Sequence, residues 1–288
     1  MKSLAQIREE FIKALSSRYS SKEIDIIFYT LAESYLHKDR TVLKLGVNEL
    51  LETSEIKSLL FQNALFHLMN GMPYQYVVGN TEFYGCKIMV NPSVLIPRPE
   101  TEELVDWVVK EHQNRGEEIR IMDLCSGSGC IAIALAKKLP CAIVSGVELK
   151  EDAIELAEKN AEVNHVKIKF IRADLTEPNR INIGAKLDII ISNPPYIREF
   201  EKASMEDNVL KYEPAEALFV PDAEPLLFYG KIIEFAHKNL KPSGEVYVEI
   251  NQELERETKE LFLEHFNFVE LKQDLSGNFR MIKAKEML

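Results

Sequence analysis

Basic residues are in the minority in this sequence. Its 288 residues include 35 lysines and arginines against 46 aspartates and glutamates, so the formal net charge is −11 at pH 7. No lysine- or arginine-rich cluster interrupts this acidic balance. Because nucleic acids are bound largely through cationic contacts to phosphate, the composition disfavours a large phosphate-binding face, although a local basic patch remains possible. We therefore expect no direct nucleic-acid partner.

Cysteines and long apolar runs are also scarce. The four cysteines have neither CxxC spacing nor paired histidines, and the six histidines are scattered, so we expect reduced, mostly buried thiols and no metal site. The opening residues, MKSLAQIREEF, carry charges where a signal peptide needs apolar residues, and no run approaches a membrane span. These absences predict a cytoplasmic protein without membrane attachment. No interface pattern stands out, and we expect a monomer.

The first part of the chain, residues 1–72, has helical patterns. Ser3 with Gln6, and Ser20 with Glu23, have the spacing of capping boxes, and apolar residues then recur every three or four positions. A third helix is predicted from near Thr53 to Met69. Helices this short are marginal alone, so we expect them to form a small bundle domain.

Residues 73–95 differ in pattern. Aromatic and β-branched residues alternate in YQYVVGNTEFYGCKIMV, with breaks at Gly79-Asn80 and Gly85, which predicts a β-hairpin. We interpret this hairpin as the linker between two domains. Prolines then keep the chain extended until a helix begins near Thr101.

Strand and helix patterns alternate over residues 96–288. The strands IRIMDL, AIVSGVEL, VKIKFIRA, LDIIIS and GEVYVEI are interspersed with helices, which predicts right-handed crossovers and a parallel sheet covered on both faces. The last two segments, FNFVELKQDL and FRMIKAKEM, predict a terminal hairpin and thus an antiparallel edge. The predicted fold class is α/β, with the seven-stranded, Rossmann-like sheet of class I methyltransferases.

A glycine turn follows the first of these strands, in MDLCSGSGCIAIALA. Gly127 and Gly129 allow the backbone to approach a ligand, and the next helix offers free N–H groups. Glu148 stands nineteen residues past Gly129, where an acid can hold ribose hydroxyls. Ala132 replaces the third glycine of a dinucleotide fingerprint, so a ligand without a pyrophosphate, namely S-adenosylmethionine, fits better. A plain strand-to-helix turn is the alternative.

Cys125 stands where the D-x-G-x-G pattern of methyltransferases has its first glycine. A cysteine is small enough for the turn but tolerates a positive φ poorly. The geometry of the turn at this position is therefore left open by the sequence, and a reactive thiol is an alternative function for the residue.

The segment ISNPPYI, residues 191–197, is the second unusual feature. Proline cannot donate to a sheet ladder, so the strand LDIIIS must end at Asn193, at the edge where such sheets bind ligands. The Asn193 side-chain oxygen and the Pro194 carbonyl oxygen can accept hydrogen bonds from an NH₂ group and orient it for methyl transfer. Tyr196 can pack against a flat amide or base. An Asn-Pro turn that merely ends a strand is the alternative.

These features resemble a known family. The motif NPPY after the fourth strand recurs in methyltransferases that act on exocyclic amino groups of adenine or cytosine and on glutamine amides. Six segments in order resemble the glutamine branch, the peptide chain release factor N5-glutamine methyltransferases of the HemK/PrmC family, over essentially the whole chain. The segments are GMPYQYVVGNTEFYG (71–85), VLIPRPETEELV (94–105), DLCSGSGCIAIALA, ISNPPYI, YEPAEALF (212–219) and DLSGNFR (274–280).

The resemblance implies methyl transfer from S-adenosylmethionine to the glutamine of the Gly-Gly-Gln (GGQ) loop of class I release factors, with S-adenosylhomocysteine as product. It implies that the helical domain recognises the substrate. Arg98 and Glu100 should border the substrate pocket and YEPAEALF should buttress the NPPY loop, with stiff loop packing as the alternative for both. The implied catalytic and substrate-amide residues are Asn193, Pro194, Pro195 and Tyr196. The implied cofactor contacts are Cys125, Ser126, Gly127, Ser128, Gly129, Glu148, Asp174, Leu175 and Asn193.

Two other functions compete with this one. An N6-adenine nucleic-acid methyltransferase uses the same NPPY chemistry, but it needs a basic groove that the composition disfavours. A non-catalytic protein that binds release factors or ribosomes would retain the fold as a scaffold, but the intact NPPY motif argues against lost chemistry. A methyl-transfer assay distinguishes the three.

Overall fold

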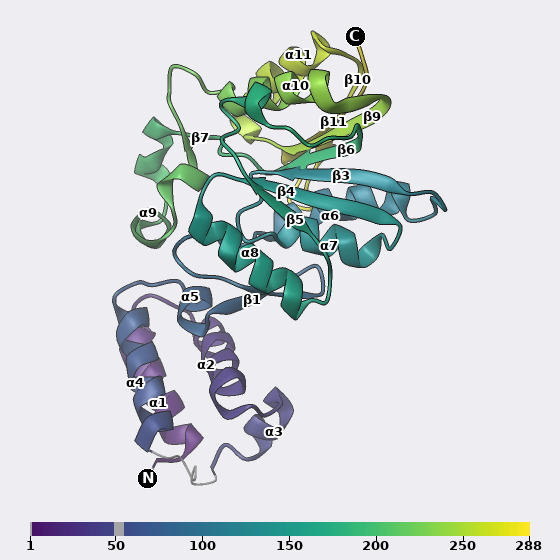
Figure 1. The fold of residues 1–288 in the computed structure, drawn as a ribbon. Coiled ribbons are helices and arrows are strands. Elements are labelled where there is room, and N and C mark those ends of the chain that lie inside the picture. The colour runs from purple at the N-terminus through teal and green to yellow at the C-terminus, as the bar shows by residue number, and fades with distance from the viewer. Residues whose placement is uncertain (1, 49–54) are drawn as a thin grey trace. The chain divides into compact units, whose positions relative to one another are not determined.

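The computed structural model describes residues 2–48 and 55–288, and these fall into two compact units (Figure 1). The described part of Met1–Gly79 forms the first unit together with Glu206–Tyr212. The second unit comprises Asn80–Met205 and Glu213–Leu288. Within the described residues, no helix has the length and apolar character needed to cross a lipid bilayer.

The first unit is helical. Both predicted capping boxes are confirmed: the side chains of Ser3 and Ser20 accept from the backbone of Gln6 and Glu23, whose side chains accept in return. The third predicted helix reaches Met69, whereas its predicted start near Thr53 lies outside the described residues. The helices are α1 (Leu4–Leu15), α2 (Ser21–Leu36), α3 (Arg40–Leu45), α4 (Glu55–Met69), α5 (Tyr74–Val78) and α9 (Asp207–Tyr212).

Aromatic rings form the centre of this unit. The ring centroid of Phe28 lies 5.4 Å from that of Phe11 and 5.8 Å from that of Phe61. All three side chains are buried, and the periodic leucines and isoleucines of α1 and α2 surround them. Burial of these large side chains stabilises helices that are too short to persist alone.

Helix α9 joins the first unit from far along the chain. The hydroxyl of Tyr212 donates to the backbone oxygen of Asn70 at 2.9 Å, and the ammonium of Lys211 donates to the same oxygen at 3.4 Å. The predicted helical domain, residues 1–72, did not include this segment. No local pattern in residues 206–212 indicates a partner so distant in sequence.

The strand predicted over residues 74–78 is wrong, because this segment forms helix α5. Tyr74, Val77 and Val78 pack against the core of the first unit, and their spacing of three and four residues suits a helical face. Gly79 ends the helix in the left-handed region, with φ 80°. The hairpin itself is shorter than predicted, with β1 (Asn80–Phe83) and β2 (Cys86–Met89), and it belongs to the second unit.

The second unit is built on a seven-stranded sheet in the order β10-β11-β9-β6-β3-β4-β5. The five strands from β9 to β5 in this order pair in parallel, whereas β11 is antiparallel to both of its neighbours, so the predicted fold class and its antiparallel edge are confirmed. The strands are β3 (Ile119–Leu124), β4 (Ala142–Glu148), β5 (Lys169–Arg172), β6 (Leu187–Ser192), β9 (Leu240–Glu249), β10 (Phe266–Gln273) and β11 (Phe279–Met287). A small separate pair is formed by β7 (Ile197–Arg198) and β8 (Phe219–Val220).

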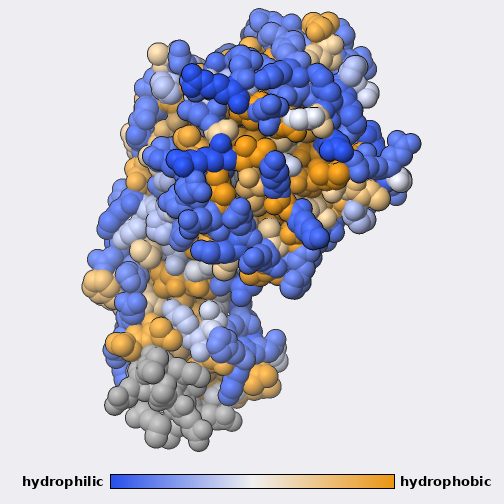
Figure 2. Space-filling view, viewed as in Figure 1, coloured by the Kyte–Doolittle hydropathy of each residue, from blue (hydrophilic) through white to orange (hydrophobic). Residues whose placement is uncertain are grey.

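Helices cover both faces of the sheet (Figure 1). On one face, α10 (Leu227–Asn239) and α11 (Glu255–Leu263) pack on a core of strand residues such as Leu124, Ile190 and Val246. The other face is covered by α6 (Pro99–His112), α7 (Cys130–Lys138) and α8 (Glu151–Val163). Figure 2 shows an area of hydrophobic residues on one face of this unit, bordered by hydrophilic ones.

Two asparagines at the C-terminal end of α8, one in the helix and one at its C-cap, hold the hairpin on the second unit. The side-chain oxygen of Asn160 accepts from the backbone of Met89 at 2.7 Å, and its nitrogen donates to the backbone oxygens of Met89 and Ser128. The nitrogen of Asn164 donates to the backbone oxygen of Lys87 at 2.8 Å. The hairpin is therefore connected, through Asn160, to the glycine turn after β3.

Candidate active site

The sheet register brings three predicted site residues to one edge. Leu124, the last residue of β3, pairs with Val147 of β4 on one side and Ser192 of β6 on the other. The residues that follow these three positions are Cys125, Glu148 and Asn193. They share the carboxyl end of the parallel strands, where such sheets bind ligands.

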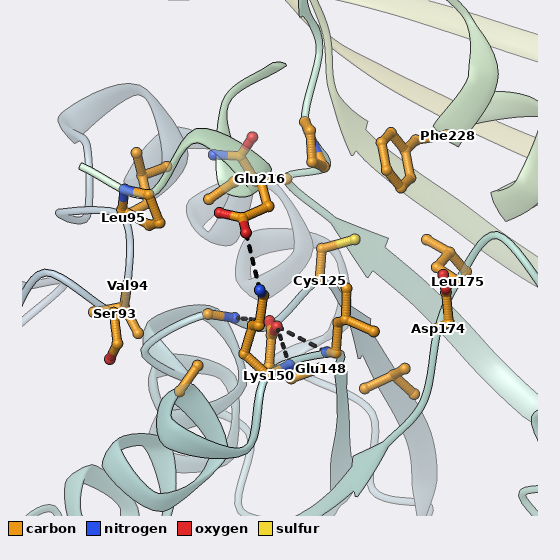
Figure 3. Close-up of a pocket in the computed structure, with 18 of the residues that line it drawn as sticks. Ser93, Val94, Leu95, Cys125, Glu148, Lys150, Asp174, Leu175, Glu216 and Phe228 are labelled. Carbon is orange, nitrogen blue, oxygen red and sulfur yellow. Dashed lines mark hydrogen bonds and ion pairs between the residues drawn. The ribbon is translucent and has the colours of Figure 1, made fainter. Parts of the chain in front are cut away.

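A cavity of about 590 Å³ opens at this edge (Figure 3). Its volume is typical of a small-molecule site. The walls come from residues 92–95, the turn after β3, the segments that follow β4, β5 and β6, and residues 214–228. In Figure 3, Ser93, Val94 and Leu95 lie on one side of the cavity, and Leu175 and Phe228 lie on the other.

The turn after β3 is held by Ser126. Its backbone nitrogen donates to the oxygen of Val147 at 3.0 Å, and its hydroxyl lies 3.0 Å from the backbone oxygen of Asp123. Cys125 has φ 60°, so a cysteine adopts the left-handed conformation that the usual glycine favours. Burial raises the pKa of the Cys125 thiol, which keeps it protonated at neutral pH and disfavours the reactive-thiol alternative.

The two glycines of the turn have different surroundings. Gly127, with φ 52°, has open space where a Cβ would stand, and it lines the cavity. Gly129, with φ 77°, does not line the cavity, and a Cβ there would lie 2.9 Å from the Phe170 ring and 3.1 Å from the Cβ of Ala157. Gly127 therefore leaves room for a ligand, whereas Gly129 allows the turn to pack on α8 and β5.

The carboxylate of Glu148 is held by backbone N–H groups. One oxygen accepts from Gly127 at 2.8 Å, and the other accepts from Leu149 at 2.8 Å and Lys150 at 3.1 Å. Each carboxylate oxygen has two acceptor positions, so the oxygen facing Gly127 can accept a further hydrogen bond. Glu148 also lines the cavity, which suits an acceptor for hydroxyl groups.

Half of the predicted site residues line the cavity and half do not. Cys125, Gly127, Glu148, Asp174, Leu175, Asn193 and Pro195 line it. Those outside its lining are Ser126, Ser128, Gly129, Pro194, Tyr196, Arg98 and Glu100. Ser126 and Ser128 are buried within the turn, and the Ser126 hydroxyl bonds to backbone oxygens there.

Several lining residues were not predicted. Lys150 and Glu216 reach toward each other across the cavity, and their charged groups lie 2.9 Å apart (Figure 3). Glu216 belongs to the YEPAEALF segment, so the motif was recognised although the contact was not. Val94 and Leu95 likewise open the VLIPRPETEELV segment, whereas Phe228, Pro92 and Ser93 belong to none of the six segments.

The NPPY corner is joined to a buried network. The side-chain nitrogen of Asn193 donates to the Thr101 hydroxyl at 3.0 Å, and that hydroxyl donates to the Glu249 carboxylate at 2.6 Å. The Tyr196 hydroxyl donates to the other oxygen of Glu249 at 2.9 Å. Burial raises the pKa of Tyr196 well above its usual value, so this hydroxyl remains a donor.

The segments VLIPRPETEELV and YEPAEALF meet at Glu213. This buried carboxylate accepts from the backbone of Ile96 at 3.1 Å and from the guanidinium of Arg98 at 2.5 Å. The Arg98 side chain is thus committed to an ion pair that connects two loops. The contact anchors residues 96–98, which directly follow the cavity wall formed by residues 92–95.

One acidic cluster lies elsewhere in the second unit. Among the described residues, Glu111, His112 and Glu245 bring ligand-type atoms within 4.8 Å of one another. The Lys283 ammonium contacts both carboxylates, and its positive charge takes the place that a metal ion would need. Burial raises the pKa of Glu245, but hydrogen bonds from His112 and Tyr247 and the charge of Lys283 lower it to about 2.

Comparison with known proteins gives the family. Residues 102–213 match the family model described as Methyltransferase small domain. The chain is 45% identical to a release factor glutamine methyltransferase of Flavobacterium psychrophilum, over 96% of this chain and 97% of the relative. It is 38% identical to one of Bacteroides thetaiotaomicron, over 94% and 96%. The chain belongs to the release factor glutamine methyltransferase family.

Membership in this family confirms the resemblance inferred from the six segments and identifies the chain as a methyltransferase. Among solved structures, the hMettl16 catalytic domain in complex with MAT2A 3'UTR hairpin 6 has a TM-score of 0.52 at 15% identity, over 80% of this chain and 81% of that chain. At that identity the likeness shows the fold alone, and it agrees with the seven-stranded sheet.

Proposed function

We propose that this protein transfers a methyl group from S-adenosylmethionine to the side-chain nitrogen, N5, of the glutamine in the GGQ loop of class I peptide chain release factors. The products are N5-methylglutamine and S-adenosylhomocysteine. The observation that carries the proposal is the position of Asn193 at the edge of the cavity, with its amide nitrogen already bonded to Thr101. Its amide oxygen is therefore available to a substrate NH₂ group. The names of the relatives support the same reaction.

The residues of the cavity fit the cofactor. Glu148 presents a fixed carboxylate to hydroxyl groups of a ribose, and Gly127 leaves the backbone open to close approach. Leu149, Leu175 and Phe228 line the cavity and supply apolar surface for a purine ring. When bound, S-adenosylmethionine supplies an electrophilic methyl group on a positively charged sulfur, which keeps the C–S electron pair as the C–N bond forms, and the amide nitrogen releases a proton to water.

The chain contributes orientation to this reaction. An amide nitrogen is a weak nucleophile because its lone pair is delocalised into the carbonyl. The Asn193 side-chain oxygen and the Pro194 carbonyl oxygen accept hydrogen bonds from the two N–H groups of the glutamine amide, which orients its nitrogen toward the methyl group. Prolines at 194 and 195 fix φ and carry no N–H donor that would compete for these oxygens.

An assay with labelled S-adenosylmethionine tests the proposal. Release factor, duplex DNA and tRNA are offered in parallel, and label is expected on the release factor, at the GGQ glutamine in a peptide map. Label on nucleic acid without label on release factor would make this chain an N6-adenine methyltransferase. No label on any substrate, with cofactor binding intact, would favour the scaffold alternative.

The first unit belongs to the proposal as the part that recognises the release factor. A chain beginning at Asn80 keeps the hairpin that Asn160 and Asn164 hold, which a cut at residue 95 would remove. We expect this shortened chain to bind cofactor and to methylate a short GGQ peptide as the full chain does, but to methylate whole release factor poorly. Equal activity of the two chains on whole release factor would contradict the assignment. A cytoplasmic location is proposed because the substrate is a translation protein, and a monomer is proposed because no interface pattern stands out in the sequence.

A further inference from the structure

The residues next to Asn193 form a buried chain of hydrogen bonds. It connects the first turn of α6, the loop after β6 and the last residue of β9 through Thr101, Tyr196 and Glu249. Thr101 is 2% exposed and Glu249 is 1% exposed, so water does not compete for these bonds. Because every polar atom in such a network needs a partner, the donors and acceptors constrain one another.

A count of hydrogens gives the direction of each bond. An ionised carboxylate only accepts, so the single hydrogen of the Thr101 hydroxyl is committed to Glu249. The Thr101 oxygen then has only lone pairs to offer, and Asn193 must turn its NH₂ group toward it. The amide oxygen of Asn193 is left for the cavity.

The Asn193 amide can adopt the reverse orientation when the side chain at position 249 carries a hydrogen-bond donor. A neutral carboxyl or an amide at 249 can give a hydrogen to the Thr101 oxygen. The Thr101 hydroxyl is then free to donate to the Asn193 oxygen, so the asparagine amide rotates and presents its NH₂ group to the substrate NH₂. Two donor groups facing each other cannot form the bond that methyl transfer requires.

Charged and titratable groups from several elements surround Glu249. The pKa of Glu249 is raised above its ordinary value, chiefly because the side chain is buried and in smaller part by Glu100 on α6, whereas hydrogen bonds from Thr101 and Tyr196 and the charge of Arg280 on β11 lower it. The Tyr229 hydroxyl of α10 lies 3.4 Å from the backbone oxygen of Glu249. The two O–H donors and the guanidinium oppose the effect of burial and stabilise the ionised form, in which Glu249 only accepts hydrogen bonds.

We propose that Glu249, acting through Thr101, is a positioning residue that directs the Asn193 oxygen toward the substrate amide. Neither residue lines the cavity, so both act through Asn193 rather than on the substrate itself. The inference rests on the proposed function, because it assigns how the proposed acceptor is oriented.

Full-length Glu249→Gln, Thr101→Val and Thr101→Ser are the test variants. Glu249→Gln keeps the shape but adds a donor, and Thr101→Val removes the hydroxyl at nearly constant volume. Both are expected to lower kcat on the order of 10- to 100-fold, as removal of an outer hydrogen-bond partner commonly does. The Kd for S-adenosylmethionine and the KM for release factor should change less than about threefold. Thr101→Ser restores the hydroxyl and should retain most of the rate.

Thr258→Val is the matched control. Thr258 is also a buried threonine, but its hydroxyl donates to the backbone of Leu254 on another face of the unit. This variant should keep the wild-type kcat, which separates the loss of a particular hydroxyl from the general cost of valine at a buried threonine.

The Glu249→Gln/Thr101→Val double variant completes the test. If both residues act through one chain of bonds, the double variant should be no slower than the slower single variant. Wild-type kcat in Glu249→Gln, or equal losses in Thr101→Ser and Thr101→Val, would overturn the inference. If Glu249→Gln does not fold, the comparison of serine with valine at 101 decides alone. A wild-type chain that fails to methylate release factor contradicts the proposed function instead, so the two failures are distinguishable.

Discussion

The side-chain nitrogen of Asn193 lies 3.0 Å from the hydroxyl oxygen of Thr101, although 92 residues separate the two in sequence. One residue follows a central strand and the other lies in the first turn of α6. The bond brings the RPETE and NPPY segments together, and it makes the proposed substrate acceptor depend on a buried network. Substitutions of residues that hold the cofactor should therefore affect cofactor binding, whereas substitutions in the network should affect methyl transfer, so the two can be tested separately.

Replacement of Glu148 should weaken cofactor binding. Glu148→Ala removes the proposed acceptor for ribose hydroxyls and the tether of the Gly127 backbone. A hydrogen bond to a charged group is worth about 1.5–3 kcal/mol, so Kd should rise on the order of tenfold or more. Titration calorimetry measures the change, with a thermal melt to verify folding. An unchanged Kd would remove Glu148 from the cofactor site.

The two glycines of the turn should respond differently to alanine. Both have positive φ, which costs about 1–2 kcal/mol for a residue with a Cβ. Gly129→Ala also places a methyl group against Phe170 and Ala157, and such overpacking adds about 1–3 kcal/mol. Gly129→Ala should therefore destabilise more than Gly127→Ala in urea unfolding. Equal free energies of unfolding would show that the close approach to Phe170 is of no consequence.

The buried carboxylate of Glu245 should make stability depend on pH in acid. Its pKa is lowered to about 2 in the folded protein from an ordinary value of 4.5. A lowered pKa stabilises the fold above the ordinary value, and the contribution is lost as pH falls from about 4.5 toward 2. The shift corresponds to an order of 3 kcal/mol.

Urea unfolding of wild type and Glu245→Gln between pH 3 and 7 measures the contribution of this carboxylate to the free energy of unfolding. The stability difference between the two should be largest at pH 6–7 and should shrink as the pH falls below about 4.5. Glu118→Gln is the control, because Glu118 forms an exposed ion pair with Arg120 that contributes little. A difference that does not vary with pH would contradict the prediction.

Local signals in the sequence were sufficient for the fold class and for most of the helices and strands. Capping boxes at Ser3 and Ser20 and the alternation of strands and helices depend on neighbours in the chain, and both are confirmed. The segment 74–78 was misassigned because a short run rich in aromatic and β-branched residues suits either a strand or a helix until the packing partner is known. Helix α9 was missed for the same reason, since its partner Asn70 is far away in sequence.

In the candidate site, too, local features could be predicted from the sequence, whereas contacts between distant residues could not. Its motifs were recognisable, since the glycines, Glu148 and the NPPY segment have characteristic spacing. Contacts between motifs were not, and these include the Lys150–Glu216 bridge and the Glu213–Arg98 pair. Motifs alone do not predict which side chains pair with each other, because the pairing depends on the packing of the whole unit.

The strongest prediction concerns Asn193. Asn193→Ala removes the acceptor for the glutamine NH₂, and loss of one positioned polar group in an active site commonly costs about 10²–10³ in rate. Asn193→Asp keeps an acceptor oxygen and nearly the same shape, yet we expect it to be impaired as well. One carboxylate oxygen must face the Thr101 oxygen, whose hydrogen is committed to Glu249, so two acceptors oppose each other.

The negative charge of the aspartate also stabilises the reactant state more than the transition state. A carboxylate close to the positively charged sulfur stabilises the state before methyl transfer, and that charge disappears as the methyl group leaves. Single-turnover rates at saturating cofactor should therefore be low in both variants while release factor still binds. Asn193→Asp should in addition bind S-adenosylmethionine at least as tightly as wild type, which Asn193→Ala has no reason to do. Near-wild-type turnover in either variant would mean that the NPPY corner only shapes the loop and that the amide is oriented by other groups.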